Sequence, residues 1–86
     1  MRLLFTEQGW ADYLYWQDHD AKLLQRINAL LAECRRSPFS GIGKPEPLRG
    51  DLAGWWSRRI NDEHRLVYRV TDDRLEIVQC RYHYHR

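Results

Sequence analysis

A strongly amphipathic helix pattern is the feature that most limits how this 86-residue chain can fold. After Asp20, apolar side chains recur on one helical face, at positions i, i+4, i+7, i+8 and i+11: Leu23, Ile27, Leu30, Leu31 and Cys34. Asp18 or Asp20 is expected to cap its start, and Ser37-Pro38 to end it. A chain of this length forms one small domain, residues 1–86, with no room for a second.

A strand and a shorter helix are predicted to precede this helix. Residues 3–5 are typical of a strand, and Thr6 is expected to cap a helix over residues 7–17. Aromatic side chains fall at helical spacing in that segment, and we interpret them as core residues: Trp10, Tyr13 and Trp16.

The chain changes character after Pro38, where Gly and Pro become frequent. Residues 39–54 are expected to form a long loop, with a brief strand near residues 46–48. A loop of this length in a small domain is usually functional. Three short strands joined by tight turns are predicted to follow it, at residues 55–60, 65–71 and 74–82.

Side-chain alternation predicts a sheet with two unlike faces. Pairing Ile60 with Leu66, and Thr71 with Arg74, gives an apolar face that the helices cover: Trp56, Ile60, Leu66, Tyr68, Val70, Leu75 and Ile77. The opposite face is rich in arginine and is the candidate site: Arg59, Arg65, Val67, Arg69, Glu76, Val78, Cys80 and Tyr82. We interpret Arg69 opposite Glu76 as a structural ion pair. Strict alternation sends His83 to the apolar face unless the strand ends or bulges near Tyr82.

The composition indicates a nucleic-acid partner without establishing one. Twelve of the fourteen basic residues are Arg, which forks two hydrogen bonds onto a phosphate, but the net charge is only +2. Residues 1–20 hold one basic and four acidic residues, whereas residues 21–86 hold thirteen basic and eight acidic ones. The sequence shows no signal peptide or transmembrane run, and its two cysteines suit a reduced cytoplasmic setting.

Cleavage of RNA without a metal needs a base, an acid and cations for the phosphate. Glu46 lies between two prolines in the long loop, and His64 and His83 are the better-placed imidazoles. Each has a simpler interpretation, as a solvated carboxylate, a turn residue or a paired side chain. Although His83 and His85 are spaced like metal ligands on a strand, no third ligand is evident, so no metal or other cofactor is expected. Taken alone, these residues support a small α/β domain that binds RNA.

Motifs along nearly the whole chain carry a more specific resemblance. They are Asp12-Tyr13-Leu14-Tyr15-Trp16, Arg36-Ser37-Pro38-Phe39, Gly43-Lys44-Pro45-Glu46-Pro47-Leu48, Trp56-Ser57-Arg58-Arg59-Ile60, Glu63-His64-Arg65-Leu66-Val67-Tyr68 and Cys80-Arg81-Tyr82-His83-Tyr84. With them the chain resembles the YoeB toxins of the RelE/ParE superfamily. The resemblance implies an α+β, RelE-like fold, with two N-terminal helices packed on a twisted, mostly antiparallel sheet. It also implies a toxin of a type II toxin–antitoxin system, an endoribonuclease that cleaves mRNA in the A site of the 70S ribosome. The implied partners are a YefM-type antitoxin and a second copy of the chain.

The resemblance also assigns roles to individual residues. Glu46 matches the general base, Arg65 the arginine that stabilises the scissile phosphate, and His83 the general acid. Residues expected to support RNA binding are Arg59, Tyr84, Lys44, Arg49 and Tyr82. His64 matches a motif residue to which we assign no catalytic role.

The sequence leaves two points open, the C-terminal residues and the alternative functions. In the family Tyr84 is typically the last residue, whereas here His85-Arg86 form a short C-terminal extension. The alternative function is a ParE-like toxin on the same scaffold, which binds a protein target such as gyrase and lacks the pair formed by Glu46 and His83. A catalytically silent RNA-binding module is a third, weaker possibility.

Overall fold

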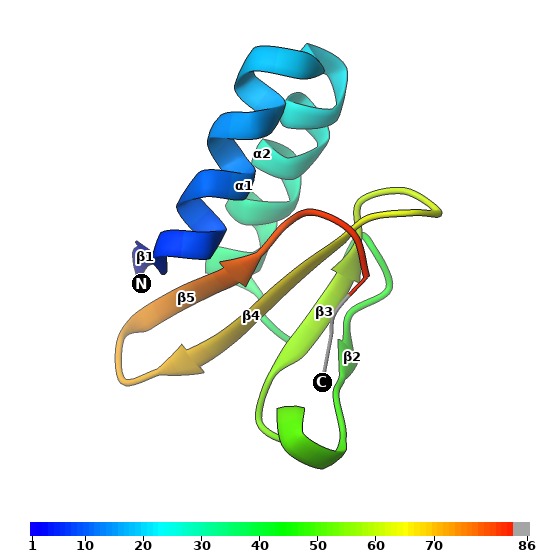
Figure 1. The fold of residues 1–86 in the computed structure, drawn as a ribbon. Coiled ribbons are helices and arrows are strands. Elements are labelled where there is room, and N and C mark those ends of the chain that lie inside the picture. Colours follow the sequence, from blue (N-terminus) through cyan, green and yellow to red (C-terminus); the bar gives the residue numbers. More distant parts are fainter. Residues whose placement is uncertain (84–86) are drawn as a thin grey trace.

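Two helices lie on one face of a five-stranded sheet in the computed structural model, which describes residues 1–83 (Figure 1). The elements in chain order are β1 (Arg2–Phe5), α1 (Glu7–His19), α2 (Ala21–Arg36), β2 (Glu46–Pro47), a 3₁₀ turn (Gly50–Leu52), β3 (Trp56–Arg59), β4 (Arg65–Thr71) and β5 (Arg74–Gln79). The strand order is β1-β5-β4-β3-β2, with β1 parallel to β5 and every other pair antiparallel. This confirms the predicted α+β architecture and its mostly antiparallel sheet.

Short polar side chains set the helix boundaries. The Oγ1 atom of Thr6 accepts a hydrogen bond from the Gly9 amide (3.1 Å), which starts α1 where the sequence predicted. Asp20 caps α2 by accepting from the Leu23 amide (3.0 Å), so the cap is Asp20 and not Asp18. Ser37 ends α2, as predicted. Within residues 1–83 neither helix is long and apolar enough to span a membrane.

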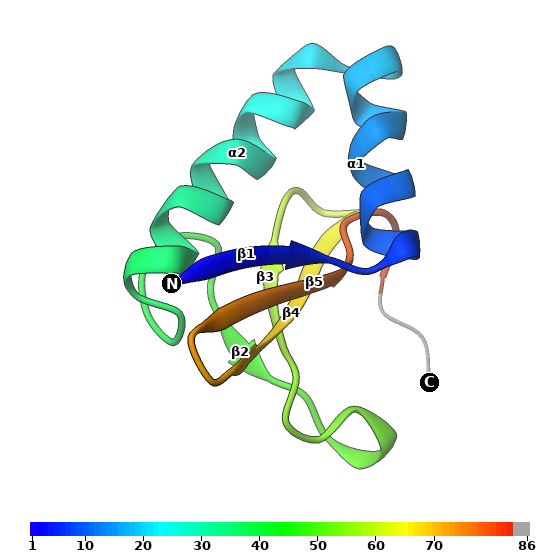
Figure 2. The same ribbon diagram turned by 90° about the vertical axis from the view of Figure 1, so that its left-hand side faces the viewer.

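The core lies between the helix pair and the sheet face below it (Figure 2). The predicted stripe of α2 is buried there, apart from the partly buried Leu23, with Trp16 of α1, against strand residues that include Leu66, Tyr68, Leu75 and Ile77. Trp10 was predicted to be core, and this was wrong: it is 48% exposed and stacks on Tyr13. The buried positions of α1 are Gly9, Asp12 and Trp16, which mark the face of the helix that packs on the core. Trp10 lies outside that face.

The register of the β3–β4 hairpin differs from the prediction by two residues. Leu66 pairs with Arg58, and the Ile60 amide donates to the His64 carbonyl (3.0 Å), which makes the turn tighter than expected. Asn61 tightens it, because its Oδ1 atom accepts from the amides of the two residues before Arg65. A shift of two residues keeps every side chain on its predicted face.

The last strand ends at Gln79, three residues before the predicted boundary at Tyr82. A bulge lies between Val67 and Tyr68, where the register of the β4–β5 pairing shifts. Cys80 was predicted on the arginine-rich face, but beyond the strand end it turns into the core and is fully buried. Burial raises the pKa of its thiol to about 12.

Candidate active site

The sheet face opposite the helices carries the predicted catalytic arginine and glutamate. Strand pairing aligns Glu46 with Ser57 and Ser57 with Val67, and one step along the same face it aligns Arg59 with Arg65. Cross-strand partners share a face, so both arginines and the glutamate lie on the face that the helices leave uncovered. Ser57 and Val67 are nonetheless buried between them. Three strands therefore contribute polar side chains to one surface, and the buried Ser57 and Val67 lie between these side chains.

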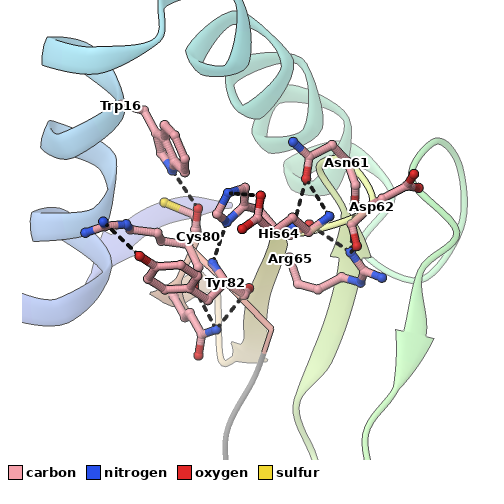
Figure 3. Close-up of polar contacts among 10 residues, drawn as sticks. Trp16, Asn61, Asp62, His64, Arg65, Cys80 and Tyr82 are labelled. Carbon is pink, nitrogen blue, oxygen red and sulfur yellow. Dashed lines mark hydrogen bonds and ion pairs between the residues drawn. The ribbon is translucent and has the colours of Figure 1, made fainter.

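Arg65 is anchored at one end of its guanidinium group. Its Nη1 atom donates to the backbone carbonyls of Asn61 (2.7 Å), Asp62 (3.3 Å) and His64 (3.0 Å), as Figure 3 shows. Within residues 1–83 it forms no ion pair with a carboxylate, and its Nε and Nη2 atoms donate to no protein group. Arg65 is thus held in place with its charge uncompensated and two donor positions available for an anionic ligand.

Glu46 is held by the backbone around it. It is exposed on the edge strand β2, and Ser57 is its partner on β3. The loop before it is fixed to the same strand, because the Arg59 amide donates to the Gly43 carbonyl (2.6 Å). Gly43 has a positive φ of 83°, and a Cβ atom there would lie 2.8 Å from the Leu30 side chain, so glycine is required. The carboxylate makes no hydrogen bond or ion pair within the described residues.

The segment after β5 crosses from the core to the start of β4. The Cys80 amide donates to Asp12 (3.1 Å), and the Trp16 indole donates to the Cys80 carbonyl (2.8 Å). The Arg65 amide then donates to the Tyr82 carbonyl (3.0 Å). The sequence left open whether His83 reaches the Arg65 side. The strand end and these bonds bring the backbone next to His83 against Arg65 (Figure 3).

His64 lies under this segment and is buried. Its ring packs edge-on against Trp16, and its Nδ1 atom accepts a hydrogen bond from the Tyr82 amide (2.6 Å). Burial is the main cause that lowers the pKa of His64; the Glu63 carboxylate acts in the opposite direction, and the charges of Arg81, His83 and Arg65 lower it further. The neutral imidazole is therefore the favoured form, which its role as an acceptor requires.

The predicted supporting residues are spread more widely. Arg59 is exposed beside Arg65, whereas Lys44 and Arg49 are exposed on the loop that flanks Glu46. Tyr82 was expected to be available for base stacking. It is 47% exposed, but the Arg81 guanidinium lies 4.8 Å from its ring centre and donates to its hydroxyl (3.0 Å). Tyr84, with His85 and Arg86, lies outside the described residues.

Several residues that shape this site were not identified from the sequence. Arg58, next to Arg59 on β3, points to the helix side, is fully buried and holds the loop before Glu46 through carbonyls of residues 37–42. Asp12 and Gln79 hold the segment that carries His83. Alternation does assign Arg58 to the helix face. Nothing in the local pattern marks Asp12 or Gln79, because their partners are distant backbone groups.

The site offers groups suited to phosphodiester chemistry. Within residues 1–83 it has a carboxylate without a partner and an anchored arginine with unused donors on one face, and a histidine follows on the segment bonded to that arginine. A carboxylate or imidazole can move protons, and a guanidinium can stabilise the charge that develops on a phosphate. Within residues 1–83 no three His, Cys, Asp or Glu side chains gather as a set of metal ligands.

The fold itself is that of the small RelE-like bacterial toxins. YafQ from Escherichia coli superposes with a TM-score of 0.71 over 95% of this chain and 93% of its own, at 21% identity, which speaks for the fold alone. The "YoeB/ParE toxin from Agrobacterium tumefaciens" superposes with a TM-score of 0.95 at 55% identity, over 98% of this chain and all of its own.

Sequence similarity identifies the family. A family model described as "YoeB-like toxin of bacterial type II toxin-antitoxin system" matches residues 5–84. Toxin YoeB of Streptomyces coelicolor is 62% identical over 98% of this chain and its whole length, and Toxin YoeB of Escherichia coli K12 is 58% identical over the same shares. YoeB of Staphylococcus aureus, solved in complex with YefM, matches at 46% identity with a TM-score of 0.90 over 98% of each chain. The chain belongs to the family of YoeB-like toxins of type II toxin–antitoxin systems.

Proposed function

We propose that this toxin is a ribosome-dependent endoribonuclease that cleaves mRNA in the A site of the 70S ribosome and thereby inhibits translation. What supports the proposal is that Glu46 and the anchored Arg65 share the uncovered sheet face, and that the segment bearing His83 is hydrogen-bonded to the Arg65 backbone. A ribosomal substrate places its site of action in the cytoplasm. It also explains how a chain with a net charge of only +2 can act on RNA, because the ribosome presents the strand.

The reaction assigned to these residues is an intramolecular transesterification, in which the phosphorus is transferred from the 5′-oxygen of the next nucleotide to the neighbouring 2′-oxygen. Glu46 takes the proton of the ribose 2′-hydroxyl, and the 2′-oxygen attacks the adjacent phosphorus. Arg65 stabilises the additional negative charge on the phosphorane through its free donors. His83 gives a proton to the departing 5′-oxygen as the bond between phosphorus and that oxygen breaks. The products are a 2′,3′-cyclic phosphate, which water can open, and a 5′-hydroxyl, and no metal takes part in these steps.

The supporting residues are assigned to contacts with the RNA. Arg59, next to Arg65, provides a second cation for the phosphate backbone, and Lys44 and Arg49 extend positive charge along the loop beside Glu46. Tyr82 and Tyr84 are assigned to the bases, on which aromatic rings stack without strong sequence preference.

The partners are proposed from the solved relatives. YoeB of Staphylococcus aureus has been solved as a dimer and in a YoeB–YefM complex. By this similarity we propose that the present chain forms a homodimer and is neutralised by a YefM-type antitoxin. Sedimentation of the purified chain, alone and with a YefM-type antitoxin, measures both assemblies.

Single-turnover cleavage on programmed ribosomes tests the proposed activity. Glu46→Ala and His83→Ala should each lower the cleavage rate by about 10²–10⁴-fold, the usual range for acid–base catalysis. Toeprinting should locate the wild-type break inside the A-site codon. Near-normal cleavage by both variants would disprove the assigned roles.

The same experiment separates the alternative functions. A ParE-like toxin that binds gyrase predicts intact mRNA in primer extension from expressing cells, together with induced DNA damage. A silent RNA-binding module predicts no cleavage by the wild-type protein, even on intact ribosomes. Breaks within codons support the nuclease and exclude both.

A further inference from the structure

We propose that His64 is a positioning residue that aims the general acid His83, by accepting the Tyr82 amide at Nδ1, and that Gln79 completes this support. The inference rests on the proposed function of His83 and adds residues to which that function assigns no role. It concerns how a histidine on an irregular segment after the last strand is held in place.

The backbone before His83 has few regular contacts. Strand pairing stops at Gln79, and Tyr82 has a positive φ of 62°, a conformation that a tyrosine rarely adopts without support. Such a residue persists only where its surroundings determine it. The hydrogen bonds around Tyr82 supply that determination.

His64 provides the acceptor on one side of this segment. The amide of Tyr82 donates to Nδ1 (2.6 Å), and the Glu63 carboxylate lies 3.6 Å from Nε2 on the other side of the ring. An amide donor at Nδ1 and an anion at Nε2 select the tautomer with hydrogen on Nε2. Contact with Trp16 fixes the ring plane. Contacts with Tyr82, Glu63 and Trp16 therefore hold the His64 ring so that its Nδ1 atom is the acceptor (Figure 3).

Gln79 provides donors on the other side. Its Nε2 atom donates to the carbonyls of Arg81 (3.0 Å), Tyr82 (3.3 Å) and His83 (2.6 Å). One side-chain amide thus gathers three successive carbonyls into a tight bend. The carbonyl of Tyr82 also accepts from the Arg65 amide, so the bend that carries the acid is fixed to the residue that is to bind the phosphate.

This geometry predicts a specific catalytic defect. Loss of the Nδ1 acceptor should leave Glu46 and Arg65 in place but let His83 move away from the leaving oxygen. An error of about 1 Å in the position of a catalytic group can cost about 10²-fold in rate. The defect should therefore concern protonation of the leaving group and no other step.

A substrate with sulfur in place of the 5′-bridging oxygen isolates that step. A thiolate departs without a proton, so this substrate does not need the acid. We expect His83→Ala to cleave the sulfur substrate at close to the wild-type rate, whereas Glu46→Ala stays slow on both substrates. These two variants establish whether His83 is the acid, independently of His64.

The test variants are His64→Leu, His64→Asn and Gln79→Glu, assayed in single turnover on programmed ribosomes with either substrate. His64→Leu should slow cleavage of the oxygen substrate by about 10–100-fold and that of the sulfur substrate by less than about threefold. His64→Asn, whose Oδ1 atom restores an acceptor near the Nδ1 position, should recover most of the rate. Gln79→Glu, which lacks donors for the three carbonyls, should behave like His64→Leu. His19→Asn and Gln25→Glu, on exposed helix positions, are matched controls.

The possible results distinguish the two hypotheses. If His83→Ala is equally slow on both substrates, the acid assignment fails and the positioning role falls with it. If sulfur rescues His83→Ala but not His64→Leu and Gln79→Glu, the proposed function stands and the positioning role is wrong. An imidazole ¹⁵N spectrum gives a check without activity, because the proposal requires His64 to carry its hydrogen on Nε2.

Discussion

The two faces of the sheet use arginine in opposite ways. Arg58 is fully buried on the helix side and donates to the Tyr68 hydroxyl (3.2 Å) and to the carbonyls of Ser37 (2.6 Å), Ser40 (2.8 Å) and Ile42 (3.0 Å). Among the described residues, Arg65 on the uncovered face donates from its Nη1 atom alone. Where every guanidinium nitrogen has a protein acceptor the arginine holds the fold together, and where nitrogens are left over it can bind a ligand.

The largest expected effect is on the helix side. Arg58→Met should lower the free energy of unfolding by about 3–5 kcal/mol, because it removes a fully buried guanidinium and leaves three partly buried carbonyls and the buried Tyr68 hydroxyl without a donor. Urea denaturation measures the change, with Arg36→Met at an exposed helix position as the control. A loss below about 1 kcal/mol would mean that these acceptors find other partners, and the contrast between the faces would disappear.

The next effect concerns Arg65. Arg65→Ala should slow single-turnover cleavage by about 10²–10³-fold, equivalent to roughly 3–4 kcal/mol in the barrier, through loss of charge stabilisation at phosphorus. Its unfolding free energy should change by less than that of Arg58→Met, because its donors reach partly exposed carbonyls. Arg65→Lys should not restore the rate fully, since an ammonium group cannot form a forked contact. Equal losses of stability in the alanine variant and in Arg58→Met would contradict the comparison.

Much of this contrast follows from local patterns in the sequence. Alternation along residues 56–60 assigns Arg58 and Arg59 to opposite faces, and the apolar residues of the strands identify the face that the helices cover. The ion pair of Arg69 with Glu76 was predicted from the turn at residues 72–73 and is confirmed, with 2.7 Å between Nε and Oε1. Periodicity and turn chemistry depend on residues close together in the chain, so both can be read from a single sequence.

The parts that escaped prediction depend on contacts between distant segments. The end of β5 at Gln79 and the burial of Cys80 result from Asp12 and Trp16, more than 60 positions away, and from a bulge that alternation cannot reveal. In the sequence His64 looks like an ordinary turn residue, and only the structure shows the hydrogen bond from the Tyr82 amide to its Nδ1 atom. The catalytic roles of Glu46, Arg65 and His83 remain predictions that the kinetic experiments test.

His64, in the turn between β3 and β4, makes stability depend on pH. Its pKa is lowered in the folded protein, chiefly by burial, so the unfolded chain binds a proton more readily near the ordinary value of 6.5. Its contribution to stability is present above that value and is lost as pH falls through the folded pKa. One proton limits the slope to about 1.4 kcal/mol per pH unit.

The variant His64→Asn isolates this contribution. Denaturation between pH 5 and pH 7.5 should give a smaller slope than in the wild type, because the variant has no imidazole to protonate while the surrounding groups remain: Glu63, Arg65, Arg81 and His83. Curves that stay parallel across this range would show that His64 does not have a lowered pKa.

The smallest effect is expected at Arg69. This residue tests what allows an arginine to bind RNA: donors without a protein partner, or its position on the uncovered face. Its Nε atom lies 2.7 Å from the Glu76 carboxylate, and its guanidinium lies 4.4 Å from the Trp55 ring centre. A double-mutant cycle with Arg69→Gln and Glu76→Gln should give a coupling of about 0.3–1 kcal/mol that weakens with salt, as for other partly exposed pairs. Cleavage should stay within about twofold of wild type, since this arginine already has a carboxylate partner. A rate loss in Arg69→Gln as large as that of Arg65→Ala would show that the whole arginine-rich face binds RNA, and that an internal partner does not mark a structural residue.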